Sequence, residues 1–589
     1  MGLVRKEVLS IQSDPRSPEH GQYGFLQDLV RRVAYETLSK RERKARHLAT
    51  AAYLEGAFPT EHEVVEVLAS HYLAAYEAVP GDDDAAEIQQ RACDLLARAG
   101  ERSASLAASA EAQHYFEQAA ALAEDRLEEA RLLERAGEMA LRAGDTQSAQ
   151  GLLEQALALL TEVGEVHQGA RVLARLGEVF WTRGRLDDAL ERLERAWNDL
   201  EGEEPDADIA TLAAAIGRVH LLRGELEPAA ARLETALELA ESLWLPEVLA
   251  EALDSSGVVM SFSSRLQQAQ ALIERALALA LEYELPAAAL RAYHNLGDVL
   301  SRLDRCAEAT AQYEAGIALA RRVGHRRYED SLLGERSWSL ALAGRWSEMF
   351  ASREQVPDDR ILDMLPSFLL ALAEPLAAQG RLGDARDLLA LHASYEDTAD
   401  FQRWEAFRAV QSVVLRAEGD AEGALAAAEE VLASALETRP ADPAVKVAFP
   451  QALEAALALG EVEKARNLLD RIESLPPGRF APSLRAHAAR FRARLAGAEG
   501  DGSSAEGAFA HAAAIFREFG MPFWLAVTQV EHGEWLAAQG KADEAEPLLA
   551  EASATFERLE AMPWLERVAA VAGQSAEVTV PQPTTASPS

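Results

Sequence analysis

The sequence contains little cysteine, few aromatic residues and much less positive than negative charge. Only two of its 589 residues are cysteine, and Cys93 and Cys306 lie far apart, which indicates neither a disulfide framework nor a metal site. The 96 acidic residues outnumber the 58 basic ones, for a formal net charge of -38 at pH 7. Because such a chain repels phosphate backbones, we expect no nucleic acid among its partners.

The sequence also lacks a long hydrophobic run and a targeting signal. The most apolar stretch, around residues 365–378, contains Glu374 and Pro375 and is too short to span a bilayer. Residues 1–6 contain no apolar region, and Lys6 stands where a myristoylation signal needs serine or threonine. We therefore expect a soluble, cytoplasmic protein that does not engage a membrane.

Motifs of common catalytic and nucleotide-binding sites are missing. The single Gly-Lys pair, Gly540-Lys541, is followed by Ala542, so there is no phosphate-binding loop. His62-Glu63 is not followed by the second histidine of a zinc-hydrolase helix, and no Gly-x-Ser-x-Gly sequence occurs. We expect a non-enzymatic chain with no catalytic residue, no cofactor and no metal.

What the sequence has instead is a repeat of about forty residues. In each repeat a glycine, or a residue in its place, is followed five positions later by a second, usually small residue. The pairs are Gly144/Ala149, Gly184/Ala189, Gly224/Ala229, Ser264/Ala269, Asp304/Ala309, Gly344/Met349, Gly380/Ala385, Gly419/Ala424, Gly460/Ala465, Gly500/Ala505 and Gly540/Ala545. The composition, rich in Ala, Leu, Glu and Arg with 6% aromatic residues, favours helix. Repeats that cannot bury an apolar face alone must stack, so we predict an all-α solenoid.

Each repeat is predicted to be a helical hairpin. In residues 173–197, apolar side chains recur at helical spacing on both sides of a turn at Gly184. Glycines seven residues before the turn position are expected to set the distance between the two helices: Gly137, Gly177, Gly217, Gly257, Gly297 and Gly533. Prolines 22 residues after the turn position are expected to begin the next unit: Pro246, Pro286 and Pro522.

The repeats cover most of the chain but not its ends. Residues 3–11 and 22–26 are predicted to form two short strands, joined by a turn at 13–18 and followed by helices. The predicted organisation is a small β-hairpin and helix segment at 1–55, a helical connector at 56–86, a first sub-array at 87–345, a second sub-array at 346–572 and a disordered tail at 573–589. Between Gly344 and Gly380 the spacing falls to 36 residues, which indicates either a flexible break or an irregular turn.

The repeat pattern resembles the tetratricopeptide repeat, although its period is about 40 residues rather than 34. This resemblance implies a right-handed α-solenoid of about twelve tetratricopeptide-like hairpins, with a groove for a protein or peptide. It places in that groove Arg131, Glu134, Glu138, Arg171, Glu178, Trp181, Arg218, Arg291, His294 and Asp298. The family's asparagine and lysine clamp for a C-terminal carboxylate is missing there, so chaperone tails are not expected. The alternative is that these side chains form a solvated face.

A second resemblance concerns residues 21–72, which include Gly21-Gln22-Tyr23-Gly24-Phe25 and Leu68-Ala69-Ser70-His71-Tyr72. They look like the winged-helix segment that closes the signalling (STAND-type) ATPase domain of large bacterial proteins. Those proteins begin with a class III adenylate/guanylate cyclase and end in a tetratricopeptide array. The resemblance implies that residues 1–55 are a winged-helix remnant and that the chain is the C-terminal part of such an architecture.

The leading interpretation is a cytoplasmic interaction and regulatory scaffold whose groove binds a protein or peptide, with cyclase or ATPase domains as partners in cis or in trans. One alternative is a fragment of a full-length nucleotide cyclase whose catalytic and ATPase domains lie upstream. The other is a regulator related to ATP-dependent transcriptional activators, although the sequence shows no C-terminal helix-turn-helix.

Overall fold

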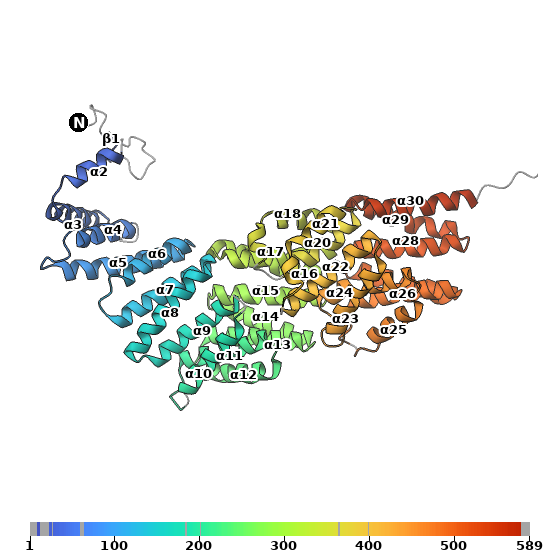
Figure 1. The fold of residues 1–589 in the computed structure, drawn as a ribbon, viewed down its shortest axis with the longest axis horizontal. Helices are drawn as coiled ribbons and strands as arrows, with labels where there is room; N and C mark the ends of the chain where they lie inside the picture. The colour runs from blue at the N-terminus through green and yellow to red at the C-terminus, as the bar shows by residue number, and fades with distance from the viewer. Residues whose placement is uncertain are drawn as a thin grey trace, which may run out of the picture. The chain divides into compact units, whose positions relative to one another are not determined.

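The computed structural model describes residues 9–11, 23–25, 28–58, 64–182, 185–200, 202–362, 366–398, 400–476 and 478–578. Over these residues the chain is almost entirely helical, and within each unit most consecutive helices pack against each other as antiparallel neighbours (Figure 1). The predicted all-α array of helical hairpins is therefore confirmed. The chain divides into two compact units, unit 1 (Met1–Arg183) and unit 2 (Gly184–Ser589), which we describe separately.

Unit 1 begins with the predicted hairpin, in which β1 (Leu9–Ile11) pairs antiparallel with β2 (Tyr23–Phe25). The turn predicted at 13–18 lies outside the described residues. The helices of unit 1 are α2 (Asp28–Glu36), α3 (Lys40–Ala57), α4 (Val65–Ala78), α5 (Ala85–Ser105), α6 (Ser109–Ala120), α7 (Arg126–Ala143), α8 (Thr146–Val163) and α9 (Val166–Thr182).

Unit 2 contains the remaining helices. They are α10 (Leu186–Asp199), α11 (Ala207–Leu222), α12 (Leu226–Ser242), α13 (Pro246–Phe262), α14 (Leu266–Glu282), α15 (Pro286–Arg302), α16 (Cys306–Val323), α17 (Arg326–Leu342), α18 (Trp346–Glu354), α19 (Asp358–Ile361), α20 (Ser367–Ala378), α21 (Leu382–Leu391), the short 3₁₀ helix η2 (Ala393–Tyr395), α22 (Phe401–Glu418), α23 (Ala421–Ala435), α24 (Pro443–Ala458), α25 (Val462–Glu473), α26 (Pro482–Glu499), α27 (Gly502–Glu518), α28 (Pro522–Ala538), α29 (Ala542–Leu559) and α30 (Met562–Val578). The predicted helix starts at Pro246, Pro286 and Pro522 are confirmed.

The glycines seven residues before the turns lie where the two helices of a hairpin touch. A Cβ atom at Gly297 would lie 2.2 Å from Cε1 of Tyr313, and one at Gly257 would lie 2.4 Å from Cγ1 of Ile273. The corresponding contacts are Gly137 with Leu153, Gly217 with Leu233, and Gly533 with Leu549. At these five positions glycine lets a large side chain of the second helix pack against the backbone of the first, as predicted.

Gly297→Ala is expected to destabilise the protein by about 1–3 kcal/mol, because the new methyl group overlaps the ring of the buried Tyr313. The matched control is Gly151→Ala in the middle of α8, where a Cβ meets nothing within 4 Å. That variant should gain about 0.5–1 kcal/mol from helix propensity. Urea denaturation of the two variants tests the assignment, and equal shifts in both would contradict it.

The turns between the two helices of a hairpin need a left-handed residue, which glycine supplies without strain. Positive φ angles occur at Gly144, Gly224, Gly344, Gly380, Gly419, Gly460, Gly500 and Gly540, whereas Gly184 lies outside the described residues. After several of these glycines an aspartate caps the next helix; the Asp145 carboxylate, for example, accepts from the Ser148 amide at 3.0 Å. The turn glycine therefore ends one helix, and the aspartate that follows it caps the start of the next.

Two turn positions keep a polar side chain in the left-handed conformation, Ser264 with φ of 58° and Asp304 with φ of 61°. The Ser264 hydroxyl donates to the carbonyl of Thr438 at 2.9 Å. The Asp304 carboxylate accepts from Nζ of Lys446 at 2.5 Å and from the amide of Ser483 at 2.6 Å. The side chains that replace glycine at these two turns thus bond to residues far away in the sequence, which offsets the backbone strain.

Similar long-range contacts occur at the next two turns of unit 2. A Cβ atom at Gly344 would lie 2.7 Å from Cγ of Pro522, and one at Gly380 would lie 3.3 Å from Cγ of Pro563. We call the contacts made by turns 264, 304, 344 and 380 the turn contacts. They join these four turns to residues at or just before the first turns of α24, α26, α28 and α30. Unit 2 is therefore not a single file of hairpins that touch only their neighbours, because one part of the array packs against another.

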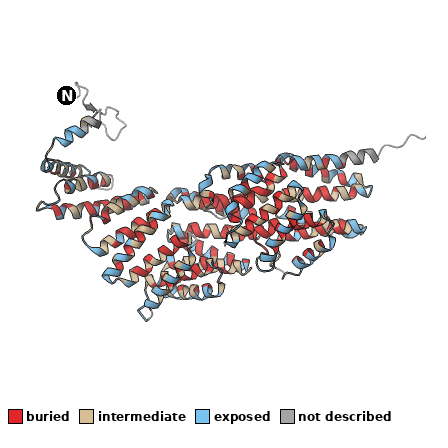
Figure 2. Ribbon diagram, in the orientation of Figure 1, coloured by how far each residue is buried: buried red, intermediate tan, exposed pale blue. Residues whose placement is uncertain are grey.

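One hydrophobic core continues through unit 2 from Ala250 to Val571, past residues 345–380. Figure 2 shows buried residues concentrated on helices such as α20, α22 and α24. The division between the compact units falls after Arg183, and the turn contacts and this core hold both sides of residue 345 together. At the C-terminal end α30 continues to Val578, six residues beyond the predicted limit of the array.

Candidate functional site

The ten residues predicted to line a groove are divided between the two units. Six lie in unit 1 on α7 and α9: Arg131, Glu134, Glu138, Arg171, Glu178 and Trp181. Four lie in unit 2 on α11 and α15: Arg218, Arg291, His294 and Asp298. The surroundings of these residues differ strongly between the units.

In unit 1 three of the predicted residues, Glu134, Glu138 and Arg171, belong to a set of ion pairs that joins neighbouring hairpins. Glu134 of α7 accepts from Nε of Arg171 at 2.9 Å and from Nε of Arg175 at 3.2 Å, both on α9. Glu138 accepts from Arg135 at 2.5 Å and from Arg142 at 2.6 Å. Arg135 also donates to Glu101 of α5, with Nη2 at 2.7 Å. We call this set the ionic ladder; its members are Glu101, Glu134, Arg135, Glu138, Arg142, Arg171 and Arg175.

The ladder is fixed in place yet reachable from solvent. Burial by itself would raise the pKa of Glu138, but the guanidinium groups of Arg175, Arg142 and Arg135 outweigh it and hold that pKa below its usual range. The side chains of Arg175 and Glu101 are 40% and 58% exposed. Of the other predicted residues, Arg131 is exposed, while Glu178 and Trp181 are half-buried.

Arg135, Arg142 and Arg175, which complete the ladder, were not among the predicted residues. A signal for two of them was present, because Arg142 follows Glu138 by four residues and Arg175 follows Arg171 by four, so each pair shares a helix face. The partner-binding role of all these residues stays a prediction.

In unit 2 the predicted residues on α15 pair with other residues of the same unit. Arg291, which is 8% exposed, lies 2.9 Å from Asp254 of α13, measured between Nε and Oδ2. Asp298 accepts from Nε of Arg302 at 2.8 Å, and Nε2 of His294 lies 3.9 Å from Glu335 of α17. Burial lowers the pKa of His294 to about 4. These charged side chains pair with other residues of unit 2, which distinguishes them from the exposed ladder of unit 1.

Glu335→Gln is expected to make stability less sensitive to pH. Burial, with the nearby Asp298 charge, raises the pKa of Glu335 to about 7. In the unfolded chain the Glu335 carboxyl ionises near the ordinary pKa of glutamate, whereas in the folded protein it stays protonated up to its raised pKa. As the pH rises between these two pKa values, Glu335 therefore lowers the free energy of unfolding of the wild type more and more. The glutamine variant should therefore gain roughly 1–3 kcal/mol near pH 8 and about nothing near pH 4.5.

Urea unfolding at the two pH values checks this expectation. Glu354→Gln, at the exposed end of α18, is the control and should leave the pH profile as it is. An equal change at both pH values in Glu335→Gln would contradict the assignment.

A larger buried ionic cluster lies on α20, α22, α24, α26 and α28 of unit 2. At its centre, the fully buried Arg490 donates from Nε to Glu531 at 2.6 Å and also pairs with Glu454. Arg494 donates to Glu454 at 2.8 Å. Next to them, Gln451 donates to Glu374 at 2.9 Å. The sequence does not reveal this cluster, because polar residues about 40 positions apart look like any other repeat of the pattern.

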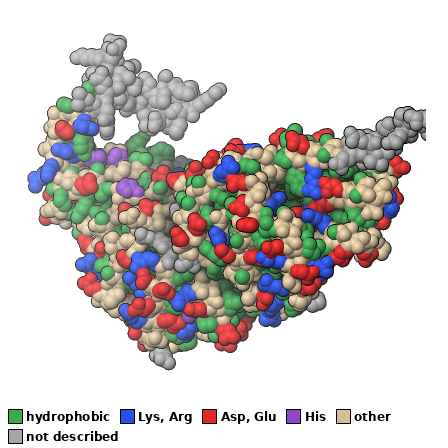
Figure 3. All heavy atoms as spheres, turned by 45° about the vertical axis from the view of Figure 1, so that its right-hand side comes forward, with side chains coloured by type: hydrophobic (Ala, Val, Ile, Leu, Met, Phe, Trp, Pro, Cys, Tyr) green, Lys and Arg blue, Asp and Glu red, His purple; other side chains and the backbone are tan. Residues whose placement is uncertain are grey.

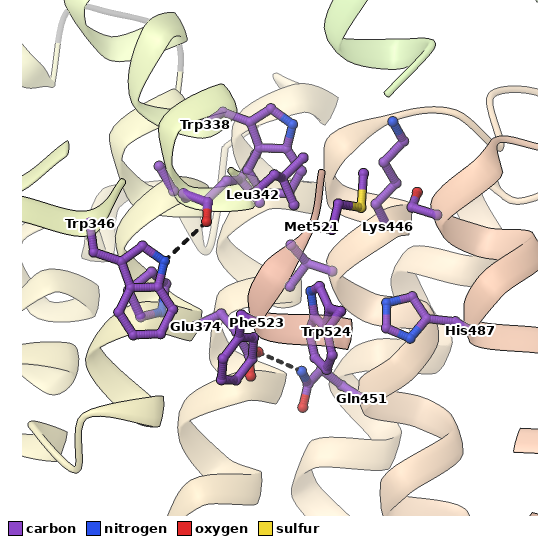
Figure 4. A pocket seen from close by; sticks show the side chains of 16 residues that line it. Trp338, Leu342, Trp346, Glu374, Lys446, Gln451, His487, Met521, Phe523 and Trp524 are labelled. Carbon is purple, nitrogen blue, oxygen red and sulfur yellow. Dashed lines mark hydrogen bonds between the residues drawn. The ribbon is translucent and has the colours of Figure 1, made fainter. Parts of the chain in front are cut away.

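A cavity of about 50 Å³ lies in unit 2 beside this cluster (Figure 4). Trp338, Leu342 and Trp346 of α17 and α18, with Glu374 of α20, line it from one part of the array. Lys446, His487 and Trp524, on α24, α26 and α28, line it from the other. The turn contacts bring these two parts together, so the cavity exists only because unit 2 packs against itself.

Reactive and metal-binding groups are scarce in the described part of the chain. Burial raises the pKa of both cysteine thiols, Cys93 and Cys306, to about 12, so neither is a thiolate at neutral pH. No group of three or more His, Cys, Asp or Glu side chains within the described ranges is placed to hold a metal ion. On the face seen in Figure 3, acidic and basic side chains are interspersed and form no patch of one sign.

Among the helices that the structure describes, none is both long and apolar enough to cross a bilayer.

The fold and these surfaces define a helical-hairpin repeat protein. Residues 128–201 and 170–242 match the family model of the tetratricopeptide repeat. No curated protein matches the chain.

Several solved structures are similar to the chain. A Rap protein complexed with competence and sporulation factor is 17% identical, over 65% of this chain and 99% of that one, with a TM-score of 0.39. A signal transduction ATPase with a tetratricopeptide repeat sensor, from Pyrococcus horikoshii, is 13% identical, over 79% of this chain and 60% of that one, with a TM-score of 0.33. The Cut9-Hcn1 hetero-tetramer of the APC/C is 11% identical, over 82% and 95%, with a TM-score of 0.42.

Proposed function

We propose that the chain is a non-enzymatic scaffold that binds a segment of a partner protein on the ionic ladder of unit 1. The observation that carries this proposal is the contrast between the two units. The charged side chains of α7 and α9 are held in a fixed pattern of ion pairs and remain accessible to solvent. The charged side chains of α15 instead form ion pairs within unit 2. A surface fixed in advance costs less conformational entropy when a partner binds.

The family match supports the same surface. The residues that match the tetratricopeptide repeat, 128–242, include most of the ladder, and this fold is typical of protein-interaction scaffolds. Arginine pairs well with partner carboxylates because its guanidinium binds them in a bidentate way. We therefore propose that Arg135 and Arg175 exchange part of their bonding from ladder glutamates to acidic side chains of the partner.

The test is a charge-reversed ladder, Arg135→Glu with Arg175→Glu. The matched control is Arg195→Glu with Arg517→Glu, two arginines on second helices that are also exposed and also paired with glutamate. Quantitative affinity capture from the host lysate, followed by cross-linking to the captured protein, should show partners that the ladder variant loses and the control keeps. A ladder variant that folds normally and keeps every partner would overturn the proposal.

We further propose that the scaffold is the regulatory C-terminal part of a signalling ATPase or nucleotide cyclase, with β1, β2, α2 and α3 as a winged-helix remnant. The resemblance of residues 21–72 supports this origin. The reading frame upstream of Met1 in genomic DNA tests it. Cyclase and phosphate-loop motifs there would support the proposal and make this sequence one part of the catalytic protein, whereas a stop codon would favour a separate adaptor.

A further inference from the structure

The cavity of unit 2 contains polar atoms that no other group satisfies. Nε1 of Trp338, Oγ of Ser483 and Nδ1 of His487 have no hydrogen-bond partner among the described residues. Their side chains line the cavity, and each residue is more than nine-tenths buried. Because a buried polar atom without a partner is costly, three of them around one cavity point to something that binds there.

The backbone adds two further acceptors. Pro375 lies inside α20 and Pro450 inside α24, and neither has an N–H group. The carbonyls four residues earlier, those of Ala371 and Lys446, therefore lose their usual intrahelical donors. Both Ala371 and Lys446 line the cavity. In each of two helices, a residue that lines this space therefore has a carbonyl without the amide donor that a helix normally supplies.

The charges near the cavity are already balanced. The Lys446 ammonium binds Asp304, and the carboxyl of Glu374 accepts from Gln451. Burial and the charge of Arg490 keep the pKa of His487 well below its usual value, so this ring is neutral at physiological pH. A charged ligand would meet no free counter-charge there and would have to lose its hydration.

The walls of the cavity are mostly aromatic. The rings of Trp346 and Phe523 lie 5.4 Å apart, and Phe523 lies 5.0 Å from the ring of Trp524, measured between centroids. Figure 4 shows side chains of α17 and α18 facing those of α24, α26 and α28. The volume of about 50 Å³ is several times what one water molecule needs, so the cavity has room for a small group rather than for a single water.

We propose that this cavity binds a small uncharged molecule, or the terminal group of one, that combines a flat apolar part with a hydrogen-bond donor and an acceptor. A carboxamide and a nitrogen heterocycle both have this chemistry. The acceptor of the ligand accepts a hydrogen bond from Nε1 of Trp338. The remaining hydrogen bonds of the ligand are made with Ser483, with His487 or with the carbonyl of Ala371 or Lys446. Because the ligand touches both parts of the array, its binding strengthens their contact.

The experiment uses the full chain and two pairs of probes. Pyrazole has a donor and an acceptor, whereas thiophene has the same ring size without an N–H; acetamide is neutral, whereas acetate is charged. Tryptophan fluorescence and thermal melting should show saturable binding of pyrazole and acetamide at millimolar concentrations, with a rise in the melting temperature. Thiophene and acetate should bind at least tenfold more weakly.

Variants locate the effect. Trp338→Phe keeps a ring but removes the donor, and Ser483→Ala removes a hydroxyl; each should weaken pyrazole binding, the first at least tenfold. Trp564→Phe, on α30 outside the cavity lining, should bind as the wild type does. No saturable binding of either neutral probe, equal binding of acetamide and acetate, unchanged affinity in both cavity variants, or a soaked crystal with only ordered water in the cavity would each overturn the proposal.

Discussion

Replacing Arg490 with leucine is expected to lower the free energy of unfolding by about 3–5 kcal/mol at neutral pH. Arg490 is completely buried and is bonded to Glu531 and Glu454. Removing the guanidinium leaves two carboxylates in the interior without their main counter-charge, and this residual charge costs more than the leucine gains by burying apolar surface.

The matched control for this substitution lies two residues away on the same helix. Arg492→Leu also breaks two ion pairs, with Asp470 and Glu473, but its side chain is 33% exposed and water replaces the lost partners. We expect a loss of about 1 kcal/mol or less. Urea denaturation of both variants gives the comparison, and similar losses would show that the Arg490 cluster is not the buried network described above.

The Arg490 effect should shrink in acid. Burial alone would raise the pKa of Glu454, but Arg490 and Arg494 outweigh it and hold this pKa below its usual value. In the wild type this lowered pKa contributes stability above the ordinary pKa of glutamate, and that contribution is lost as the pH falls toward the folded value. Arg490→Leu lacks the stabilisation that Arg490 gives to the Glu454 carboxylate, so the stabilities of the two proteins should approach each other as the pH falls from about 4.5 toward about 2.

The second large effect is expected from Asp304→Ala, which should cost about 3–5 kcal/mol. The Asp304 carboxylate is the ion-pair partner of the buried Lys446 and caps the first turn of α26 through the Ser483 amide. Without it, the Lys446 ammonium keeps, among the described residues, only the carbonyls of Ser301 and Arg302. A buried cation without a carboxylate is strongly unfavourable.

A double-mutant cycle separates this pair from the rest of the fold. Lys446→Met removes the charge that Asp304→Ala leaves behind, so the double variant should recover part of the loss, with a coupling of at least about 2 kcal/mol. The two residues are 142 positions apart in the sequence. In an array whose hairpins touch only their neighbours they would not interact, and additive losses in the cycle would contradict the Asp304–Lys446 contact.

The sequence predicted the hairpins well because their signals are local. A glycine such as Gly297 is needed where Tyr313 packs on the helix, and both lie within one repeat of the pattern. A turn glycine such as Gly144 is likewise needed for its own left-handed backbone. Residues that have the same structural role in every repeat recur in the sequence at the period of the repeat.

The turn contacts do not recur at the period of the repeat, although the sequence shows where two of them begin. Ser264 and Asp304 break the glycine pattern, which marks them as special, but nothing in the repeat says that their partners are Thr438 and Lys446. Likewise, the family pattern places Arg291 in a groove but does not say that Arg291 pairs with Asp254 of α13. Which surfaces stay open depends on how the hairpins curve over many repeats, and the period alone does not specify this.

The contact between distant repeats of unit 2 can be measured directly by cross-linking. In a Ser264→Cys/Thr438→Cys variant, a short bismaleimide should join the two new cysteines within one chain in dilute solution, as peptide mass spectrometry would show. The pair Gly224→Cys/Thr438→Cys should not be joined, because Gly224 makes no such contact. If both cysteines of the first variant react with the reagent but remain unlinked to each other, the packing of unit 2 against itself is wrong.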